Sequence, residues 1–151
     1  MDAATCTILQ NALRAESRSF LQYVSDAFPW TSPDELAVLS KLQTLITEER
    51  EGMQMLGHLL TQARQPLPYL GSYPMSFTTM NFVSLDHLLP ILIREKQRSL
   101  ASREQDLARV RDVDAQVALR GIIDMKRRHL QTLEEMAATH SPPSASVRSS
   151  A

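Results

Sequence analysis

Cysteine, long apolar runs and basic tracts are scarce or missing in this chain of 151 residues, and each scarcity excludes a class of protein. The one cysteine, Cys6, has no partner for an internal disulfide and cannot build a cysteine-rich zinc site, which favours a reducing compartment. No run approaches the roughly 18 apolar residues that a membrane-spanning helix needs. The N-terminus, MDAATCTILQ, opens with an acid and lacks the basic start of a secretory signal. We therefore expect a cytoplasmic protein that does not enter a membrane.

Positive charge is not in excess either. The 16 lysines and arginines are balanced by 17 aspartates and glutamates, which leaves a net charge of -1. A nucleic-acid-binding surface needs concentrated positive charge, so we expect no nucleic-acid partner. The chain also lacks a glycine-rich phosphate loop, a serine or cysteine nucleophile motif and a Cys-x-x-Cys pair. These absences favour a role that is not enzymatic.

Helix signals dominate what is present. Glycine occurs only four times, and no segment keeps the two-residue alternation of a strand, so the sequence predicts an all-α fold. Apolar residues three and four positions apart predict four helices. They cover about residues 5–27, 33–63, 84–110 and 112–138.

The predicted helix starts carry capping residues. Ser32 is a good N-cap, Pro33 suits the first helical position, and Glu35 completes a capping box. Asp112 or Asp114 would cap the last helix. The second and fourth helices therefore have well-marked beginnings.

Residues 64–83 contain three prolines and a glycine without a helical stripe, which predicts a long connection. Twenty extended residues can run the length of a helix, so the second and third helices can lie parallel. The other two links are short and predict antiparallel hairpins. Pro90 should kink the third helix or delay its start. We expect one domain over residues 1–138 and a disordered, serine- and proline-rich tail over 139–151.

Each predicted helix has an apolar stripe that is interrupted by an ionisable residue. Steps of three and four residues from Leu39 meet apolar side chains at every position except Glu49. The interruptions on the other three stripes are Glu16, Glu95, and the pair Lys126 and His129. Buried ionised groups must pair with each other, change protonation or bind a metal. The centre of the bundle is therefore the first place to look for function.

Two helical hairpins joined by a long connection, with acids pointing inward, resemble the ferritin-like family, including its bacterioferritin and rubrerythrin branches. In that family two helices supply one glutamate each, and the other two supply Glu-x-x-His. Over residues 5–138, Glu16 and Glu95 match the single glutamates, Glu49 matches the start of one motif, and His129 matches the end of the other. The resemblance implies a ferritin-like four-helix bundle with a crossover between its second and third helices, and a metal site at these four residues.

Two positions depart from the family pattern. Gly52 stands where one histidine is expected, which deletes an imidazole and leaves space for water. Lys126 stands where a glutamate is expected, and its ammonium has three donors and no acceptor. Among carboxylates its pKa should be raised. Three glutamates and one lysine carry a net charge of -2, which balances one divalent ion but not two.

Three states of this site remain open. The favoured state is metal-free, with Lys126 in a buried salt-bridge cluster. In the second state, Glu49, Glu95 and His129 hold one iron, zinc or manganese ion with Glu16 nearby. The third is an active di-iron oxidase. We expect a degenerate di-iron site without ferroxidase activity and a structural or binding role; the alternative is a mononuclear metal-binding protein or oxidoreductase.

The resemblance also implies a homodimer, because ferritin-like bundles commonly pair along their first two helices. The long connection offers a candidate contact surface. The residues that would form it are Tyr69, Leu70, Tyr73, Met75, Phe77, Met80 and Phe82. A simpler interpretation is that these side chains cover the open side of the bundle.

Overall fold

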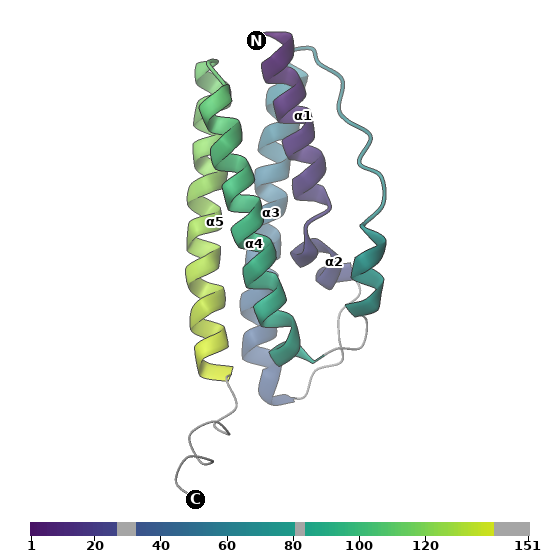
Figure 1. Cartoon of the computed structure of the whole chain (residues 1–151), viewed down its shortest axis with the longest axis vertical. Coiled ribbons are helices and arrows are strands. Elements are labelled where there is room, and N and C mark those ends of the chain that lie inside the picture. Colours follow the sequence, from purple (N-terminus) through teal and green to yellow (C-terminus); the bar gives the residue numbers. More distant parts are fainter. Residues whose placement is uncertain (27–32, 81–83, 141–151) are drawn as a thin grey trace, which may run out of the picture.

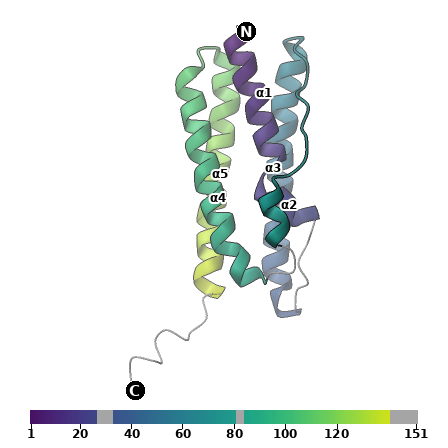
Figure 2. The same cartoon turned by 45° about the vertical axis from the view of Figure 1, so that its right-hand side comes forward.

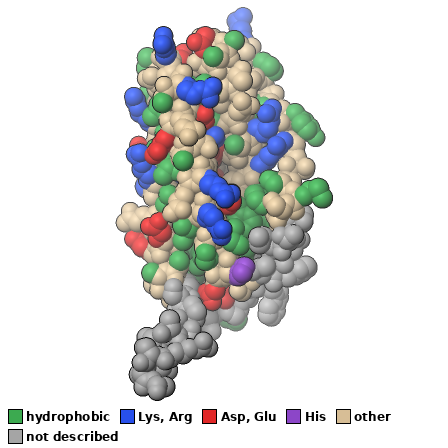
Figure 3. Space-filling model, in the orientation of Figure 1, with side chains coloured by type: hydrophobic (Ala, Val, Ile, Leu, Met, Phe, Trp, Pro, Cys, Tyr) green, Lys and Arg blue, Asp and Glu red, His purple; other side chains and the backbone are tan. Residues whose placement is uncertain are grey.

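Helices make up the computed structural model of this protein, which describes residues 1–26, 33–80 and 84–140. The elements are α1 (Ala3–Ser17), α2 (Phe20–Asp26), the 3-10 turn η1 (Pro33–Glu35), α3 (Leu36–Gln62), the 3-10 turn η2 (Met75–Met80), α4 (Leu85–Arg109) and α5 (Val113–His140). No strand occurs within the described ranges, so the all-α prediction is confirmed. None of the described helices is long and apolar enough to cross a membrane. On the face in Figure 3, acidic and basic side chains are interspersed.

The first predicted helix is divided in two. We expected one helix over 5–27, but α1 ends at Ser17, and the N–H of the following Arg18 turns back to carbonyls of the last turn. Ser19 lies in the break, and its hydroxyl accepts a hydrogen bond from the N–H of Gln22 at 3.1 Å, as an N-cap does. The same hydroxyl donates to Glu49 at 2.6 Å. The break therefore supplies a polar group to the interior that a continuous helix would not.

Helix α3 matches its prediction closely only at its end. It begins at Leu36, three residues after the predicted start, because Pro33–Glu35 form the 3-10 turn η1. It ends at Gln62, one residue before the predicted end. At its start, Glu35 is the capping position and makes no capping hydrogen bond with its side chain. Ser32, the proposed cap, lies outside the described residues. The capping box therefore stays a prediction.

Helices α4 and α5 also begin near their predicted positions. Pro90 lies inside α4, which starts at Leu85, so the delayed start is wrong. Asp112 caps α5, because its carboxylate accepts the N–H of Ala115 at 2.9 Å. Helix α5 continues to His140, two residues beyond the predicted end. Residues 141–151, most of the proposed tail, lie outside the described part of the chain.

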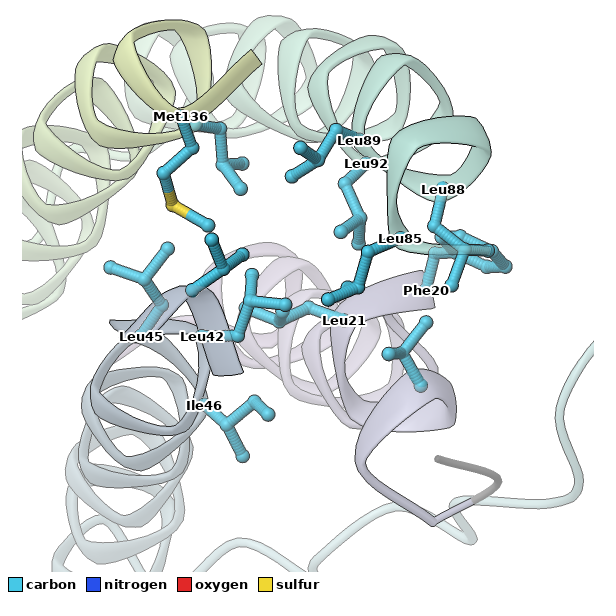
Figure 4. Packing of buried hydrophobic residues seen from close by; sticks show 13 residues of the cluster. Phe20, Leu21, Leu42, Leu45, Ile46, Leu85, Leu88, Leu89, Leu92 and Met136 are labelled. Atoms are coloured by element: carbon cyan, nitrogen blue, oxygen red, sulfur yellow. The ribbon is translucent and has the colours of Figure 1, made fainter. Parts of the chain in front are cut away.

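Two apolar clusters occupy opposite halves of the bundle. The cluster in Figure 4 joins α2 and the first half of α3 to the first half of α4 and the end of α5. The other joins α1 and the second half of α3 to the first half of α5. Burial of these side chains is the main source of stability. The two clusters leave a middle level of the bundle to polar residues.

The segment after α3 lies against α1. Carbonyl oxygens of the segment accept hydrogen bonds from Gln10 (to Pro66, 2.8 Å) and Arg14 (to Tyr69, 3.0 Å). Figures 1 and 2 show it following α1 to η2 on the outside of the bundle. Phe77 of η2 then packs edge-on against Phe20, with ring centroids 5.0 Å apart.

Only part of the connection acts as a cover. Phe77 and Tyr73 contact the aromatic residues of α2. Tyr69 and Met75 are instead 85% and 86% exposed. Phe82 lies outside the described residues, and the side chain of Met80 is not described. The covering interpretation therefore holds for Tyr73 and Phe77 and not for Tyr69 and Met75.

Gly71 is required by the path of this connection. Its φ of +70° lies in the left-handed region, and an added Cβ would collide with the guanidinium of Arg18. We expect Gly71→Ala to lower the free energy of unfolding by about 1–2 kcal/mol or more, measured by denaturant titration. Gly57→Ala is the control, because a Cβ there meets only Leu67 at 3.9 Å and alanine favours a helix. Equal stability of the Gly71 variant and the parent would contradict this conformation.

Candidate functional site

A layer of buried charges separates the two apolar clusters. Five charged side chains are buried in it: Glu16, Glu49, Lys96, Arg103 and Lys126. His129 is also fully buried. The interior location predicted for Glu16, Glu49, Lys126 and His129 is thereby confirmed.

Glu16 is bound by two cations from two helices. Lys126 of α5 donates to one carboxylate oxygen at 2.6 Å. Arg103 of α4 donates to the other at 3.2 Å, and the hydroxyl of Ser99 lies 3.4 Å from it. The same Arg103 nitrogen also donates to the carbonyl of Ala12. Both oxygens of Glu16 are therefore satisfied by charge-assisted hydrogen bonds.

Glu49 has a separate set of partners. Lys96 of α4 forms a buried ion pair with one oxygen. The other oxygen accepts hydrogen bonds from Ser19 at 2.6 Å and from the amide of Gln22 at 3.1 Å. Both of these groups come from the α1–α2 break and the turn that follows it. The broken helix is thus coupled directly to the central carboxylate of α3.

Glu95 is not part of the buried layer. Its side chain is 34% exposed and pairs with the exposed Arg98 at 3.3 Å. The prediction that Glu95 points inward is wrong because four-residue steps along α4 lead from Leu92 to Lys96 and on towards Arg103. Buried leucines define the phase of α4 only as far as Leu92, because few apolar residues follow it.

His129 pairs with Glu48, a residue outside the four predicted apolar stripes. Its Nε2 lies 2.8 Å from the carboxylate of Glu48, which is 36% exposed. That nitrogen therefore carries the hydrogen, and Nδ1 presents a lone pair. Nδ1 is buried and has no hydrogen-bond partner among the described residues. Glu48 was missed because it lies one residue off the apolar stripe of α3.

Gly52 does not border open space. A Cβ at this position would lie 3.7 Å from Ile122 and 3.8 Å from Met125. An added Cβ would therefore be in ordinary contact with apolar side chains of α5. The expectation that water could occupy the place of the missing imidazole stays a prediction.

The charge balance of the layer is the reverse of what a metal centre needs. The five buried charged residues comprise two acids and three bases and sum to +1, whereas the sequence led us to expect -2. Asp106 adds one partly buried acid, with an oxygen 3.0 Å from Arg103 Nε but out of line for a hydrogen bond. No cluster of three or more histidine, cysteine, aspartate or glutamate side chains suited to a metal occurs in the described part of the chain. These residues do not fit a two-metal group.

The pKa values in the layer reflect competition between burial and pairing. Burial would raise the pKa of Glu49, but Lys96 and then Lys126 outweigh it and bring the pKa to about 2. Burial lowers the pKa of Lys126 despite the adjacent Glu16, and repulsion from Lys96 acts in the same direction. The raised pKa that we expected for Lys126 is therefore wrong. Burial, followed by Lys96, also lowers the pKa of His129, which is neutral at pH 7.

Comparison of the chain with family models, curated proteins and solved structures found no match. The fold and the buried layer are therefore the basis on which function is inferred.

Proposed function

We propose that this chain is a ferritin-like four-helix bundle in which a metal-free layer of ion pairs occupies the position of a two-metal centre, and that its role is structural or binding. Support for the architecture comes from the order and direction of the helices. Helices α3 and α4 start at the same end of the bundle, and the segment that joins them lies along α1 (Figures 1 and 2). This is the arrangement that a crossover between parallel helices requires.

The neutralisation of both central carboxylates is the observation that carries the proposal. Each oxygen of Glu16 and of Glu49 already accepts at least one hydrogen bond, and each carboxylate has a buried cation in contact. A divalent ion would have to displace Lys96 or Lys126 and then remain beside that displaced ammonium. Repulsion between like charges in a poorly solvated interior makes such an exchange unfavourable.

A single divalent ion is the second candidate, and His129 is the observation that favours it. Its Nδ1 is the one unpaired acceptor that the described layer offers to iron, zinc or manganese. Charges of both signs surround His129, because its pKa is influenced by Lys96 as well as by Glu48 and Glu49. Because Glu95 lies on the rim and glycine stands at position 52, this site would have one imidazole and few free carboxylate oxygens.

Metal analysis tests the proposal directly. We expect protein that is purified without added metal to contain far less than one metal ion per chain, and we expect Fe²⁺ titration in air to cause no oxygen uptake beyond that of buffer. Stoichiometric binding of one ion would favour the mononuclear alternative. Two bound irons with turnover of oxygen would show that the ion-pair layer is not a replacement for the metal centre.

Lys126→Glu is the matching substitution. It removes the closest cation from Glu16 and places a second acid beside it, so without metal we expect a loss of at least about 3 kcal/mol in the free energy of unfolding. Added Zn²⁺ or Mn²⁺ should restore part of this loss by binding the folded state. The control is Arg120→Glu, an exposed position on the same helix. Unchanged stability and no metal response would show that Lys126 lies outside the cluster.

We also propose that the chain forms a homodimer, as the resemblance to ferritin-like bundles suggests. Exposed apolar side chains are available on α3 and on the start of α5, including Leu36, Met55, Val113 and Val117. Sedimentation velocity at micromolar concentration measures the mass directly. A monomer at every concentration would contradict the dimer and leave the interpretation of the buried layer untouched.

A further inference from the structure

A pocket of about 260 Å³ reaches from the surface to the buried layer. It lies between the α1–α2 break and α4, and Pro74 and Phe77 of the long connection border its third side. Ser102 and Arg98, which are exposed, mark its mouth, and Lys126 lies at its inner end. Its volume is slightly below the range of pockets for drug-sized ligands, so it is suited to a smaller molecule.

Positive charge dominates the polar part of this pocket. Five basic side chains line it, against two acidic ones. Three of the basic residues, Lys96, Arg103 and Lys126, are themselves buried. Of the two acids, Glu95 stands on the rim beside Arg98, and Glu49 already accepts from Lys96. Glu16, behind the lining, pairs with both Arg103 and Lys126, and Asp106 lies beside Arg103. The five buried charged residues still sum to +1, which would attract a negatively charged ligand to the inner end.

The buried cations also have hydrogen-bond donors to spare. Each ammonium has three N–H groups, yet among the described residues Lys96 Nζ donates only to Glu49, and Lys126 Nζ donates only to Glu16. The Nε of Arg103 makes no hydrogen bond to the described residues, despite its proximity to Asp106. Unpaired donors in a buried place are costly unless an acceptor reaches them. An oxyanion at the inner end would supply several acceptors together with the compensating charge.

The opposite wall of the pocket is apolar. Phe20, Leu21, Phe77 and Leu92 contribute to it. Phe20 and Phe77 meet edge-on, and further ring contacts connect both to Tyr23. A bare inorganic anion would leave this wall in contact with water. An apolar or aromatic body would bury it, and an aromatic ring could also extend the edge-to-face contacts.

We propose that this pocket binds a small organic carboxylate with an apolar or aromatic body, with the carboxylate at Lys96, Arg103 and Lys126 and the body against Phe20 and Phe77. This inference rests on the proposed function, because it requires that the ion-pair layer is free of metal. It also extends that function, because it gives the layer a ligand. The charge, the spare donors and the apolar wall are three separate features of the same pocket.

Benzoate is the probe, and ¹⁵N-labelled protein is followed by NMR during titration after metal analysis of the same sample. We expect saturable shifts of backbone signals around the α1–α2 break and Ser99 to Arg103, with an affinity at least tenfold higher than that for benzyl alcohol, acetate or phosphate. Benzyl alcohol keeps the ring without the charge, and acetate and phosphate keep the charge without the ring. Equal affinity for any of these three, or no saturable response to benzoate, would overturn the assignment.

Two variants at exposed arginines test the location without disturbing the core, and a third replaces the buried Arg103. Arg98→Gln at the mouth should weaken benzoate binding by about two- to fivefold, whereas Arg120→Gln, exposed on α5, should have no effect. Arg103→Gln should weaken binding by at least tenfold if its spectrum remains that of a folded chain. Equal effects of the Arg98 and Arg120 substitutions would overturn the location.

The metal analysis separates this inference from the proposed function. Metal-free protein that ignores benzoate would contradict the ligand site and leave the ion-pair layer as proposed. Stoichiometric metal, with benzoate binding that disappears after treatment with a chelator, would contradict both. Metal-free protein that binds benzoate tightly would support both.

Discussion

Lys96→Met should lower the free energy of unfolding by about 3–5 kcal/mol at pH 7, because it leaves the buried carboxylate of Glu49 without its cation. Ser19 and Gln22 would still donate hydrogen bonds to Glu49, so the loss belongs to the missing charge. The pKa of Glu49 should then rise above its ordinary value, since burial is the largest influence on it and the strongest opposing one is removed. Chemical denaturation at pH 7 and at pH 5 measures both effects, and the loss should be smaller at pH 5.

Arg98→Met is the matched control for this substitution. It removes an ion pair from the same helix, two residues away, but Arg98 and Glu95 are both solvated. Exposed pairs contribute about 0–1 kcal/mol, so the two variants should differ severalfold. If Arg98→Met and Lys96→Met cost the same, the Glu49 pair does not lie in a dry interior.

The double variant Lys96→Met/Glu49→Leu completes the test. Replacing a buried ion pair by apolar side chains of similar size is often neutral or stabilising. We therefore expect the double variant to recover most of the stability that Lys96→Met loses. A double variant as unstable as the single one would assign the cost to lost packing around Lys96, because removal of the stranded carboxylate would then bring no relief.

The spacing of residues in the sequence predicted which side chains lie inside the bundle, wherever apolar neighbours defined the phase of the helix. Each of Glu16, Glu49 and His129 is buried and has a leucine or isoleucine one turn away on at least one side. These neighbours are Leu13, Ile46 and Leu133, respectively. The assignment failed at Glu95, where serines and charged residues follow Leu92 and a three-residue step looks as acceptable as a four-residue step. An error of one residue in the phase of α4 placed the acid Glu95 in the interior instead of Lys96. The predicted net charge of the site was therefore negative, whereas that of the buried layer is positive.

Other features of the site depend on contacts between distant segments. Ser19 breaks the first helix where its hydroxyl can both cap α2 and donate to Glu49, and the second partner lies 30 residues away. Arg103 reaches Glu16 across 87 residues. Local propensity carries no information about such pairs. The lowered pKa of Lys126 likewise depends on how completely it is buried, which the list of neighbouring charges does not reveal.

Acid should destabilise this protein in two separate steps. His129 has a folded-state pKa below its ordinary value of 6.5, so below pH 6.5 the unfolded chain binds a proton that the folded chain does not, and stability falls as pH drops. Glu49 has a folded-state pKa of about 2 against an ordinary 4.5, so its contribution is complete above pH 4.5 and is lost as pH falls towards 2. This difference between the two pKa values of Glu49 corresponds to roughly 3 kcal/mol in the free energy of unfolding.

Variants assign each step of the acid response to its residue. His129→Gln cannot take up the proton, so its stability should be flat between pH 7 and 5, where that of the parent declines. The double variant Lys96→Met/Glu49→Leu lacks the buried carboxylate, so its free energy of unfolding should change much less than that of the parent between pH 4.5 and 2. Denaturant titrations at half-unit pH intervals measure both profiles. An unchanged decline in His129→Gln would assign the first step to other groups, because glutamine carries no charge at any pH. A decline that disappears only in that variant would identify the neutral imidazole beside Lys96 as the group that limits stability in mild acid.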